Sequence, residues 1–354
     1  MEDENVKESE SEYMYFSSAS FYLNYTGSYE FSIPWRWNLT VVLIMAVFGI
    51  AVNMALLLVI VLNQHMRTIS NLLVANLAVA DLIMFFFSVP FDIVQWNVST
   101  WPRGIGGKIL CKLGSAVWGL AQVLCVASLT AVSVERYCSL RWPRMQVKRS
   151  FLILGAVWLI AIVFAIPILR FANVEHFGKY ISFCYVVPPW GTFARAVTTT
   201  YCALTYVLPV IVISCCYVGM ASTLMSRNDG ADTASVRARR LLSVVVLILA
   251  ISFVVCWFPI QFVNLYVLFM DPYSMSFEFI ISCWEVGHVL VYVNSCLNPL
   301  VVFIISGLHR KPLVGCFTKN RKKPSTSNQN DPYSQIQEEA SLSETEHVDL
   351  EPLE

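Results

Sequence analysis

The sequence is poor in charged residues, which make up 14% of its 354 positions, whereas hydrophobic residues account for 56%. Its mean hydropathy of +0.60 is too high for an ordinary soluble domain and indicates a polytopic membrane protein. The opening residues MEDENVKESESEYMYF lack both the basic and the apolar segment of a cleaved signal peptide. We therefore expect the first membrane-spanning helix to direct insertion.

The sequence also lacks the motifs of hydrolytic enzymes. Neither GxSxG nor HExxH occurs, and His288 stands apart from the other four histidines. There is no internal repeat of the kind found in many transporters. Ionisable groups within the apolar segments are concentrated at Asp81 and at the segment ends rather than along a pore. These absences disfavour a membrane hydrolase, a transporter and a channel, and we expect no enzyme.

Seven apolar segments are long enough to cross a bilayer. They cover about Trp37–Leu62, Ile69–Trp96, Lys108–Leu140, Phe151–Phe171, Phe193–Met225, Arg237–Met270 and Phe277–Ser306. We predict an all-α membrane protein in which residues 38–306 form a seven-transmembrane helix bundle. An odd number of spans places the two termini on opposite sides of the membrane.

Basic residues identify the inner side of the membrane. The connection after the third segment contains Arg141, Arg144, Lys148 and Arg149, and the sixth segment begins with Arg237, Arg239 and Arg240. Because short cytoplasmic loops collect Lys and Arg, the amino terminus is predicted to be extracellular and the carboxy terminus cytoplasmic. The sequon Asn24-Tyr25-Thr26 agrees with this topology and makes Asn24 a candidate glycosylation site.

Both ends of the chain are acidic although the formal net charge is zero. Residues 1–37 and 324–354 have compositions that do not suit a hydrophobic core, so both are predicted to be disordered. Residues 307–323, GLHRKPLVGCFTKNRKK, are basic and amphipathic, which predicts a short eighth helix on the inner membrane surface with Cys316 palmitoylated. A simple basic flank is the alternative.

Eleven cysteines cannot all be paired with one another. Most lie inside apolar segments, where a thiol behaves as a small hydrophobic group. Cys111 and Cys184 are the two that fall in the predicted extracellular loops. Because that side is oxidising, we expect them to form a disulfide bond.

Polar residues at comparable depth in three segments form a second pattern. Asp81 needs partners inside the membrane, and they are available at Asn53, Asn294, Ser295 and Asn298. Such a cluster could hold water or a sodium ion, because hard cations prefer oxygen ligands. A protonated Asp81 in a purely structural network is the equal alternative. The pair Glu135-Arg136 likewise suits either a functional role or an anchoring helix cap.

The sixth segment contains an aromatic pair beside a proline. Phe253 and Trp257 are four residues apart on one helix face, and Pro259 kinks the helix just after them. Two further prolines, Pro209 and Pro299, are predicted to kink the fifth and seventh segments.

In their order, these motifs resemble those of rhodopsin-like (class A) G-protein-coupled receptors from about Asn38 to Cys316. The resemblance rests on GIAVN at 49–53, LAVAD at 77–81, ERY at 135–137, Trp158, Pro209 with Tyr217, CWFP at 256–259 and NSCLNP at 294–299. It implies a switch that activates a G protein, made of Glu135, Arg136, Tyr137, Tyr217, Phe253, Trp257, Pro259, Asn298 and Pro299. It also implies the Cys111–Cys184 bridge and an allosteric sodium and water site at Asp81, Asn294, Ser295 and Asn298.

Three positions depart from the family pattern. Val302 replaces the tyrosine that usually links to Tyr217, and Cys125 replaces an oxygen ligand near the sodium site. Arg144 stands where a bulky apolar residue usually contacts the G protein. A decoy receptor that binds its ligand without signalling is therefore an alternative.

The position at which aminergic receptors carry an aspartate is Trp118, so a catecholamine or indolamine ligand is disfavoured. Aromatic anchors with scattered polar groups suit one end of a peptide instead. The predicted ligand pocket comprises Asp92, Gln95, Trp118, Gln122, Gln261, Asn264, Trp284, His288 and Tyr292, with Trp96, Trp101, Tyr201 and Glu285 nearby. The carboxylates Asp92, Glu278 and Glu285 would attract a basic peptide residue, although each could instead pair with Arg103 or Arg195.

The stretches SVPF at 88–91 and VYVNSCLNP at 291–299 are similar to those of galanin- and kisspeptin-type neuropeptide receptors. Sulfation of Tyr13 and Tyr15 would instead resemble chemokine and chemoattractant receptors. The resemblance implies a plasma-membrane protein whose partners are an extracellular peptide, a heterotrimeric G protein and membrane lipids. Receptor kinase and arrestin would act on tail residues such as Ser341 and Ser343. We expect no nucleic-acid partner and no cofactor beyond an allosteric sodium ion.

Overall fold

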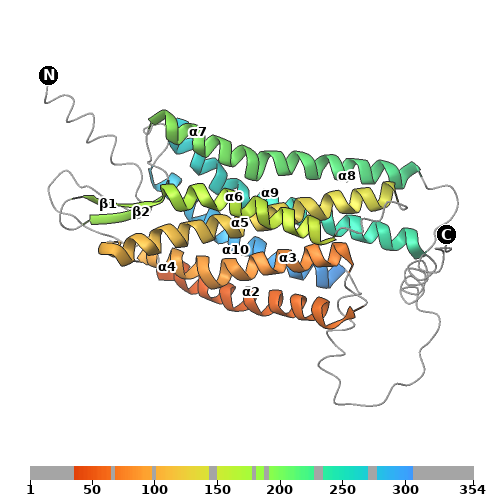
Figure 1. The fold of residues 1–354 in the computed structure, drawn as a ribbon. Coiled ribbons are helices and arrows are strands. Elements are labelled where there is room, and N and C mark those ends of the chain that lie inside the picture. Colours follow the sequence, from red (N-terminus) through yellow and green to blue (C-terminus); the bar gives the residue numbers. More distant parts are fainter. Residues whose placement is uncertain are drawn as a thin grey trace, which may run out of the picture.

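The computed structural model describes residues 36–64, 68–97, 101–142, 150–177, 181–186, 191–226, 234–269 and 277–305. Within these ranges, seven helical segments are long and apolar enough to cross a membrane. They lie side by side as a bundle (Figure 1). The predicted eighth helix with Cys316, both acidic tails, Asn24 and Arg144 lie outside the described residues.

The helices follow the predicted apolar segments closely, which confirms the fold class. The seven spans consist of α2 (Arg36–Leu62), α3 (Ile69–Ile83) with η3 (Met84–Ser88) and α4 (Val89–Asn97), α5 (Gly104–Arg141), α6 (Ser150–Phe171), α7 (Gly191–Cys202) with η4 (Ala203–Val207) and α8 (Leu208–Ser226), α9 (Ala234–Phe269), and α10 (Phe277–Ile305). The largest difference is at the start of the third span, which begins at Gly104 rather than Lys108.

Helix α5 occupies the middle of the bundle, where it contacts α3, α6, α8 and α9. Its inward side chains Ala121, Val126 and Leu129 are buried in the same apolar cluster as Phe253 and Trp257 of α9. By contrast, α6 exposes Leu159 and Val163 on its outer face. Exposed apolar side chains are stable there because lipid tails are as apolar as leucine. We call the end of the bundle near Cys111 the disulfide end and the opposite end, near Arg136, the arginine end.

Two spans contain a turn of π-helix just before a proline. Segment η3 precedes Pro90, and η4 precedes Pro209. A proline has no N–H to donate and clashes with the carbonyl four residues earlier, so a wider turn relieves the conflict. The predicted irregularity at Pro209 is therefore a π-turn, and the one at Pro90 was not predicted.

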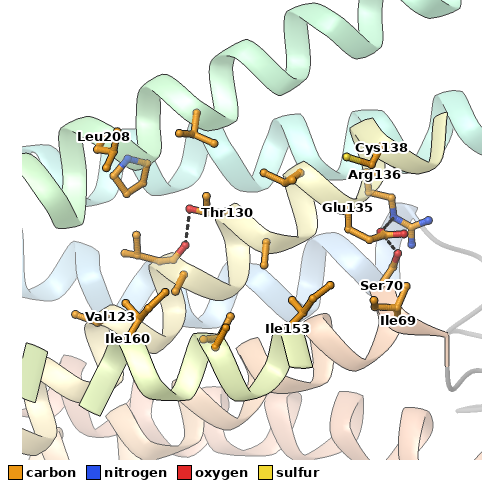
Figure 2. Close-up of a pocket in the computed structure, with 18 of the residues that line it drawn as sticks. Ile69, Ser70, Val123, Thr130, Glu135, Arg136, Cys138, Ile153, Ile160 and Leu208 are labelled. Carbon is orange, nitrogen blue, oxygen red and sulfur yellow. Dashed lines mark hydrogen bonds and ion pairs between the residues drawn. The ribbon is translucent and has the colours of Figure 1, made fainter. Parts of the chain in front are cut away.

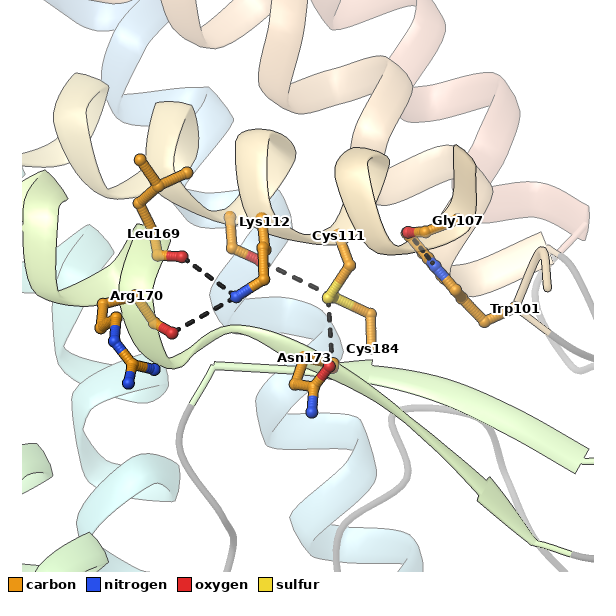
Figure 3. The surroundings of a disulfide bond; sticks show 9 residues. Trp101, Gly107, Cys111, Lys112, Leu169, Arg170, Asn173 and Cys184 are labelled. Atoms are coloured by element: carbon orange, nitrogen blue, oxygen red, sulfur yellow. Dashed lines mark hydrogen bonds between the residues drawn. A yellow bond between two sulfur atoms is a disulfide. The ribbon is translucent and has the colours of Figure 1, made fainter. Parts of the chain in front are cut away.

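A β-hairpin connects the fourth and fifth spans at the disulfide end. Strands β1 (Asn173–Phe177) and β2 (Ile181–Tyr185) are antiparallel and pair Val174 with Cys184. The predicted disulfide between Cys184 and Cys111 is present and ties this hairpin to α5 (Figure 3). The strands add a small sheet to a fold predicted as all-α, because five-residue segments give too short an alternation to recognise.

Candidate functional site

At the arginine end, Glu135 holds three polar groups together (Figure 2). Its Oε2 atom lies 3.6 Å from Nε of Arg136 and accepts a hydrogen bond from the hydroxyl of Ser70 on α3. Its Oε1 atom accepts a 2.7 Å hydrogen bond from Ser139. The carboxylate thus links the start of α3 to α5. The contact to Arg136 is longer than a charge-assisted hydrogen bond. It therefore restrains the guanidinium but leaves its N–H donors available for other partners.

Tyr137, the third residue of this motif, contacts other parts of the bundle. A Cβ atom added at Gly219 on α8 would lie 2.5 Å from the Tyr137 ring, so the missing side chain lets the ring approach α8. The ring also packs edge-on against Trp142, with 5.9 Å between the ring centres. Tyr137 therefore joins the third span to the fifth rather than adding to the ion pair.

An aromatic column runs along the inside of the bundle. The ring centres of Phe253 and Trp257 are 6.0 Å apart, and those of Trp257 and Trp118 are 6.4 Å apart. Tyr206 packs on Phe253 at 5.8 Å and donates a 2.9 Å hydrogen bond to the carbonyl of Val254. The carbonyl of Val254 lies one residue before that of Val255, which Pro259 leaves without its helical N–H partner. Because Trp118 contacts Trp257, a displacement of Trp118 would move the segment of α9 next to Pro259.

The predicted polar cluster around Asp81 is brought together. Its carboxylate accepts a 2.9 Å hydrogen bond from Asn298 Nδ2, and Ser295 hydrogen-bonds the same carboxyl group. Asn53 Nδ2 donates to the carbonyl oxygens of Gly49 and Ser295, at 2.9 and 3.0 Å. Helices α2, α3 and α10 are thereby joined through side chains that are almost fully buried.

The side-chain oxygen atoms of this cluster suit the coordination of a sodium ion. The buried Oδ1 atoms of Asn53 and Asn294 have no hydrogen-bond partner among the described residues. Together with the Asp81 carboxylate and the Ser295 hydroxyl, they offer the oxygen ligands that hard cations prefer. Cys125 lies close to both Asp81 and Asn298, but its thiol is a poor ligand for such an ion. Sodium binding stays a prediction.

A second polar network, which was not predicted, joins three spans. Trp158 Nε1 on α6 donates a 2.8 Å hydrogen bond to Oδ1 of Asn76 on α3. Asn76 Nδ2 in turn donates to Ser128 on α5, also at 2.8 Å, and Ser128 donates to the carbonyl of Leu124. The sequence signal was an asparagine within the apolar run of the second span. Each of the three side chains has a hydrogen-bond partner within the bundle, which indicates a structural role for this network.

Several of the predicted ligand-contact residues meet towards the disulfide end. Tyr292 donates a hydrogen bond to the carboxylate of Asp92, which is only 3% exposed. Among the described residues, no Lys or Arg forms an ion pair with this carboxylate. Tyr201 donates a 2.9 Å hydrogen bond to Gln122 Oε1, while Gln122 Nε2 is buried without a partner in the described part of the chain. Buried polar groups in this state favour a polar ligand.

Three aromatic residues of the predicted pocket form one stack. The rings of Trp284 and His288 have centres 4.0 Å apart, and Trp118 lies 6.3 Å from His288. His288 Nδ1 also lies 2.9 Å from the carbonyl oxygen of Trp284. The stack meets the column of Trp257 at Trp118, so the ligand-contact residues and the switch residues are in continuous contact.

Other predicted pocket residues lie elsewhere in the outer half of the bundle. Gln261 and Asn264 are on α9, and Gln95 is on α4. Trp101 does not belong to the pocket. It is 2% exposed, packs on Phe91 and donates a 2.9 Å hydrogen bond to the carbonyl of Gly107, next to the disulfide (Figure 3).

Comparison with known proteins identifies the family. The model of the 7 transmembrane receptor (rhodopsin family) matches residues 52–301, which is most of the chain. The chain belongs to the rhodopsin family of seven-transmembrane receptors. It is therefore a multi-pass membrane receptor rather than an enzyme. The described residues contain the seven spans, the Glu135-Arg136 pair and the disulfide bond that the resemblance implied.

Individual relatives are neuropeptide receptors. The chain is 29% identical over 290 residues to the neuropeptide CCHamide-1 receptor of Drosophila melanogaster, with 75% of this chain and 57% of that receptor covered. It is 28% identical to the allatostatin-A receptor of Bombyx mori, with 73% of each chain covered. It is 31% identical to galanin receptor 2b of Danio rerio, covering 68% and 64%. The predicted peptide-receptor group and its similarity to galanin receptors are confirmed.

Proposed function

We propose that this receptor lies in the plasma membrane, binds an extracellular peptide at the disulfide end and activates a heterotrimeric G protein at the arginine end. The observation that carries this proposal is the continuous contact from His288 through Trp118 and Trp257 to Phe253. It gives a ligand at one end a physical route to the sixth span. The names of the relatives, all of them receptors for peptides, support the class of ligand.

The side chains at the disulfide end suit a peptide with a basic residue. Trp118, Trp284 and His288 provide flat anchors, and aromatic anchors dominate many binding interfaces. Asp92 lacks a basic partner in the described part of the chain, so a ligand cation would supply one. Gln122 Nε2, buried without a partner, offers a donor to a peptide carbonyl. Together these groups favour the end of a peptide over a small amine.

Activation follows from how the two ends are connected. A ligand that displaces Trp118 moves Trp257. The proline of α9 then lets the part of the helix before it, from Ala234 to Phe258, swing outwards. The arginine end then opens, and Arg136 exchanges Glu135 for the G protein. An ion pair with partial exposure contributes only about 1 kcal/mol or less, so modest differential binding of the ligand is enough to shift the equilibrium.

A screen against a neuropeptide library tests this proposal directly. Cells expressing the chain are assayed with both calcium and cyclic-AMP readouts, and cells expressing Arg136→Ala serve as the signalling-dead control. A peptide that produces a response in cells with the native chain, but not in cells with Arg136→Ala, supports the proposal. A peptide that binds at the surface but produces no response through any G protein would identify a decoy receptor instead, which the buried Val302 makes the second candidate.

The orientation in the membrane needs its own test. Epitope tags at the two ends of the chain, stained in intact and in permeabilised cells, should place the amino terminus outside and the carboxy terminus inside. Staining of the carboxy-terminal tag on intact cells would overturn the proposed topology. Phosphorylation of the acidic tail and arrestin recruitment after stimulation are expected on the same grounds.

A further inference from the structure

A cavity of about 1000 Å³ lies between α5, α6 and the fifth span and extends to Ile69 and Ser70 at the start of α3 (Figure 2). Its walls run from Val123 to Ser139 on α5, from Ile153 to Phe164 on α6 and from Leu204 to Val212 on η4 and α8. Several lining side chains are exposed on the surface of the bundle, including Ile160 at 46% and Leu208 at 49%. The cavity therefore opens towards the bilayer rather than into the centre of the receptor.

The extent of the cavity along α5 is similar to the thickness of one membrane leaflet. Val123 lies at the middle of the 38-residue helix α5. From there to Ser139 the helix rises about 24 Å, at roughly 1.5 Å per residue. Half of the hydrocarbon core is about 15 Å thick, and the headgroup layer adds about 5 to 7 Å. The cavity thus extends from the mid-membrane to the headgroup layer of the leaflet at the arginine end.

Polarity changes along the cavity in the same direction. The deep part is lined mainly by apolar side chains such as Val126, Ala127 and Ile160, whereas the ionic groups lie at the arginine end. The deep hydroxyls of Thr130 and Thr205 donate hydrogen bonds to backbone carbonyls of their own spans, so they need no partner from the cavity. An apolar cavity is a poor site for water, and an empty one forfeits dispersion contacts. An acyl chain suits the deep part, because it makes these contacts without needing a polar partner.

At the polar end, Arg136 has unused hydrogen-bonding capacity. Its guanidinium carries five N–H donors. Only the 3.6 Å contact with Glu135 is formed among the described residues, and the side chain is 23% exposed. Glu135, in turn, is shared with the hydroxyls of Ser70 and Ser139. A phosphodiester at this depth would find a fork of donors that matches its geometry.

We infer that this cavity binds one membrane phospholipid, with an acyl chain against α5, α6 and α8 and the phosphodiester on Arg136. The phosphate competes with Glu135 for the guanidinium, so an occupied cavity loosens the ion pair at the arginine end. Binding of the lipid is independent of the proposed peptide and G-protein functions. Only the step from a loosened ion pair to G-protein activation rests on the proposed function.

Photo-crosslinking tests the binding. The full chain is reconstituted in phosphatidylcholine vesicles with a small fraction of phosphatidylcholine that carries a diazirine on one acyl chain, and crosslinked peptides are mapped after irradiation. Ala156→Trp fills the cavity from α6, while Ala165→Trp, on the same helix but outside the lining, is the matched control. We expect labelling of residues 123–131 to fall at least fivefold in the first variant only. Equal labelling in both variants would overturn the proposal.

A second comparison uses the native chain and needs no substitution. Diacylglycerol with the same diazirine chain lacks the phosphate, so it should label residues 123–131 at least threefold less than phosphatidylcholine does. Arg136→Gln should reduce phosphatidylcholine labelling to the level of diacylglycerol, because it removes the cation. Equal labelling by the two lipids in the native chain would refute the phosphate contact, whether or not any peptide agonist has been found.

Discussion

Asn298 on α10 donates a 2.9 Å hydrogen bond to the carboxylate of Asp81 on α3, although 217 positions separate the two residues. Both side chains are almost fully buried. The bond satisfies one acceptor site of a carboxylate that has about four, so Asp81 can accept further donors or a cation. Asn53 on α2 and Asn294, one turn before Asn298 on α10, each keep a buried amide oxygen without a partner among the described residues. The cluster therefore has capacity for an ion.

Replacing Asp81 tests the sodium prediction without an agonist. In the native chain, sodium chloride should raise the midpoint of thermal unfolding relative to choline chloride, because an ion that binds the folded state stabilises it. Asp81→Asn keeps the size of the side chain but removes its charge, so the sodium effect should disappear. Asp92→Asn changes a different buried carboxylate and should leave the effect intact. A sodium effect that survives in Asp81→Asn would contradict the assigned site.

The positions of the spans could be predicted from the sequence because a bilayer demands about 20 apolar residues per helix. The depth of Asp81 and Asn298 within their spans also follows from counting, so their proximity was expected. Contacts between the ends of helices are different. The hydrogen bond from Ser70 to Glu135 depends on where the start of α3 meets α5, which hydropathy does not specify.

Local backbone changes were harder to predict. A proline indicates a broken hydrogen bond but not whether the helix kinks or widens, so the π-turns before Pro90 and Pro209 were missed. Trp101 was expected beside the ligand pocket because tryptophans at a membrane boundary look alike in sequence. Its hydrogen bond to Gly107 beside the disulfide distinguishes it only in three dimensions.

Arg136→Ala should abolish G-protein activation while sparing delivery to the cell surface. The guanidinium is the cation that the proposed mechanism transfers from Glu135 to the G protein. Arg141→Ala, five residues further along α5, removes an exposed arginine and is the matched control. Agonist-stimulated nucleotide exchange, normalised to surface staining, checks the outcome. Exchange that persists in Arg136→Ala would show that this residue is not the switch.

Glu135→Gln should raise nucleotide exchange in the absence of agonist. The amide keeps the shape of the side chain but removes the charge that attracts Arg136. Loss of about 1 kcal/mol of restraint corresponds to a rise of roughly fivefold in basal activity. Glu175→Gln makes the same change in the hairpin at the opposite end and should have no effect on basal activity. An unchanged basal rate in Glu135→Gln would mean that the ion pair does not restrain the resting receptor.

Cys184→Ser should weaken ligand binding or reduce the amount of receptor at the cell surface. The disulfide is the covalent link between the hairpin and α5, and removal of a native disulfide typically costs about 2 to 5 kcal/mol in small secreted domains. Cys283→Ser changes a half-buried cysteine that is not bridged and should behave like the native chain. Surface staining and the unfolding midpoint measure both variants. Native values for Cys184→Ser would show that the bridge is dispensable.

Substitution of Val302 tests whether the absence of a tyrosine hydroxyl at this position weakens signalling. This residue is 3% exposed and lies in the same apolar cluster that Tyr217 packs against. Val302→Tyr and Val302→Phe both enlarge the side chain, and overpacking a core costs about 1 to 3 kcal/mol in either case. The two variants therefore differ chiefly by one hydroxyl, and a net hydrogen bond of about 1 kcal/mol would raise agonist-stimulated exchange roughly fivefold in the tyrosine variant. If the phenylalanine variant signals equally well, a phenol link at this position has no part in activation, and the valine is no reason to consider the receptor a decoy.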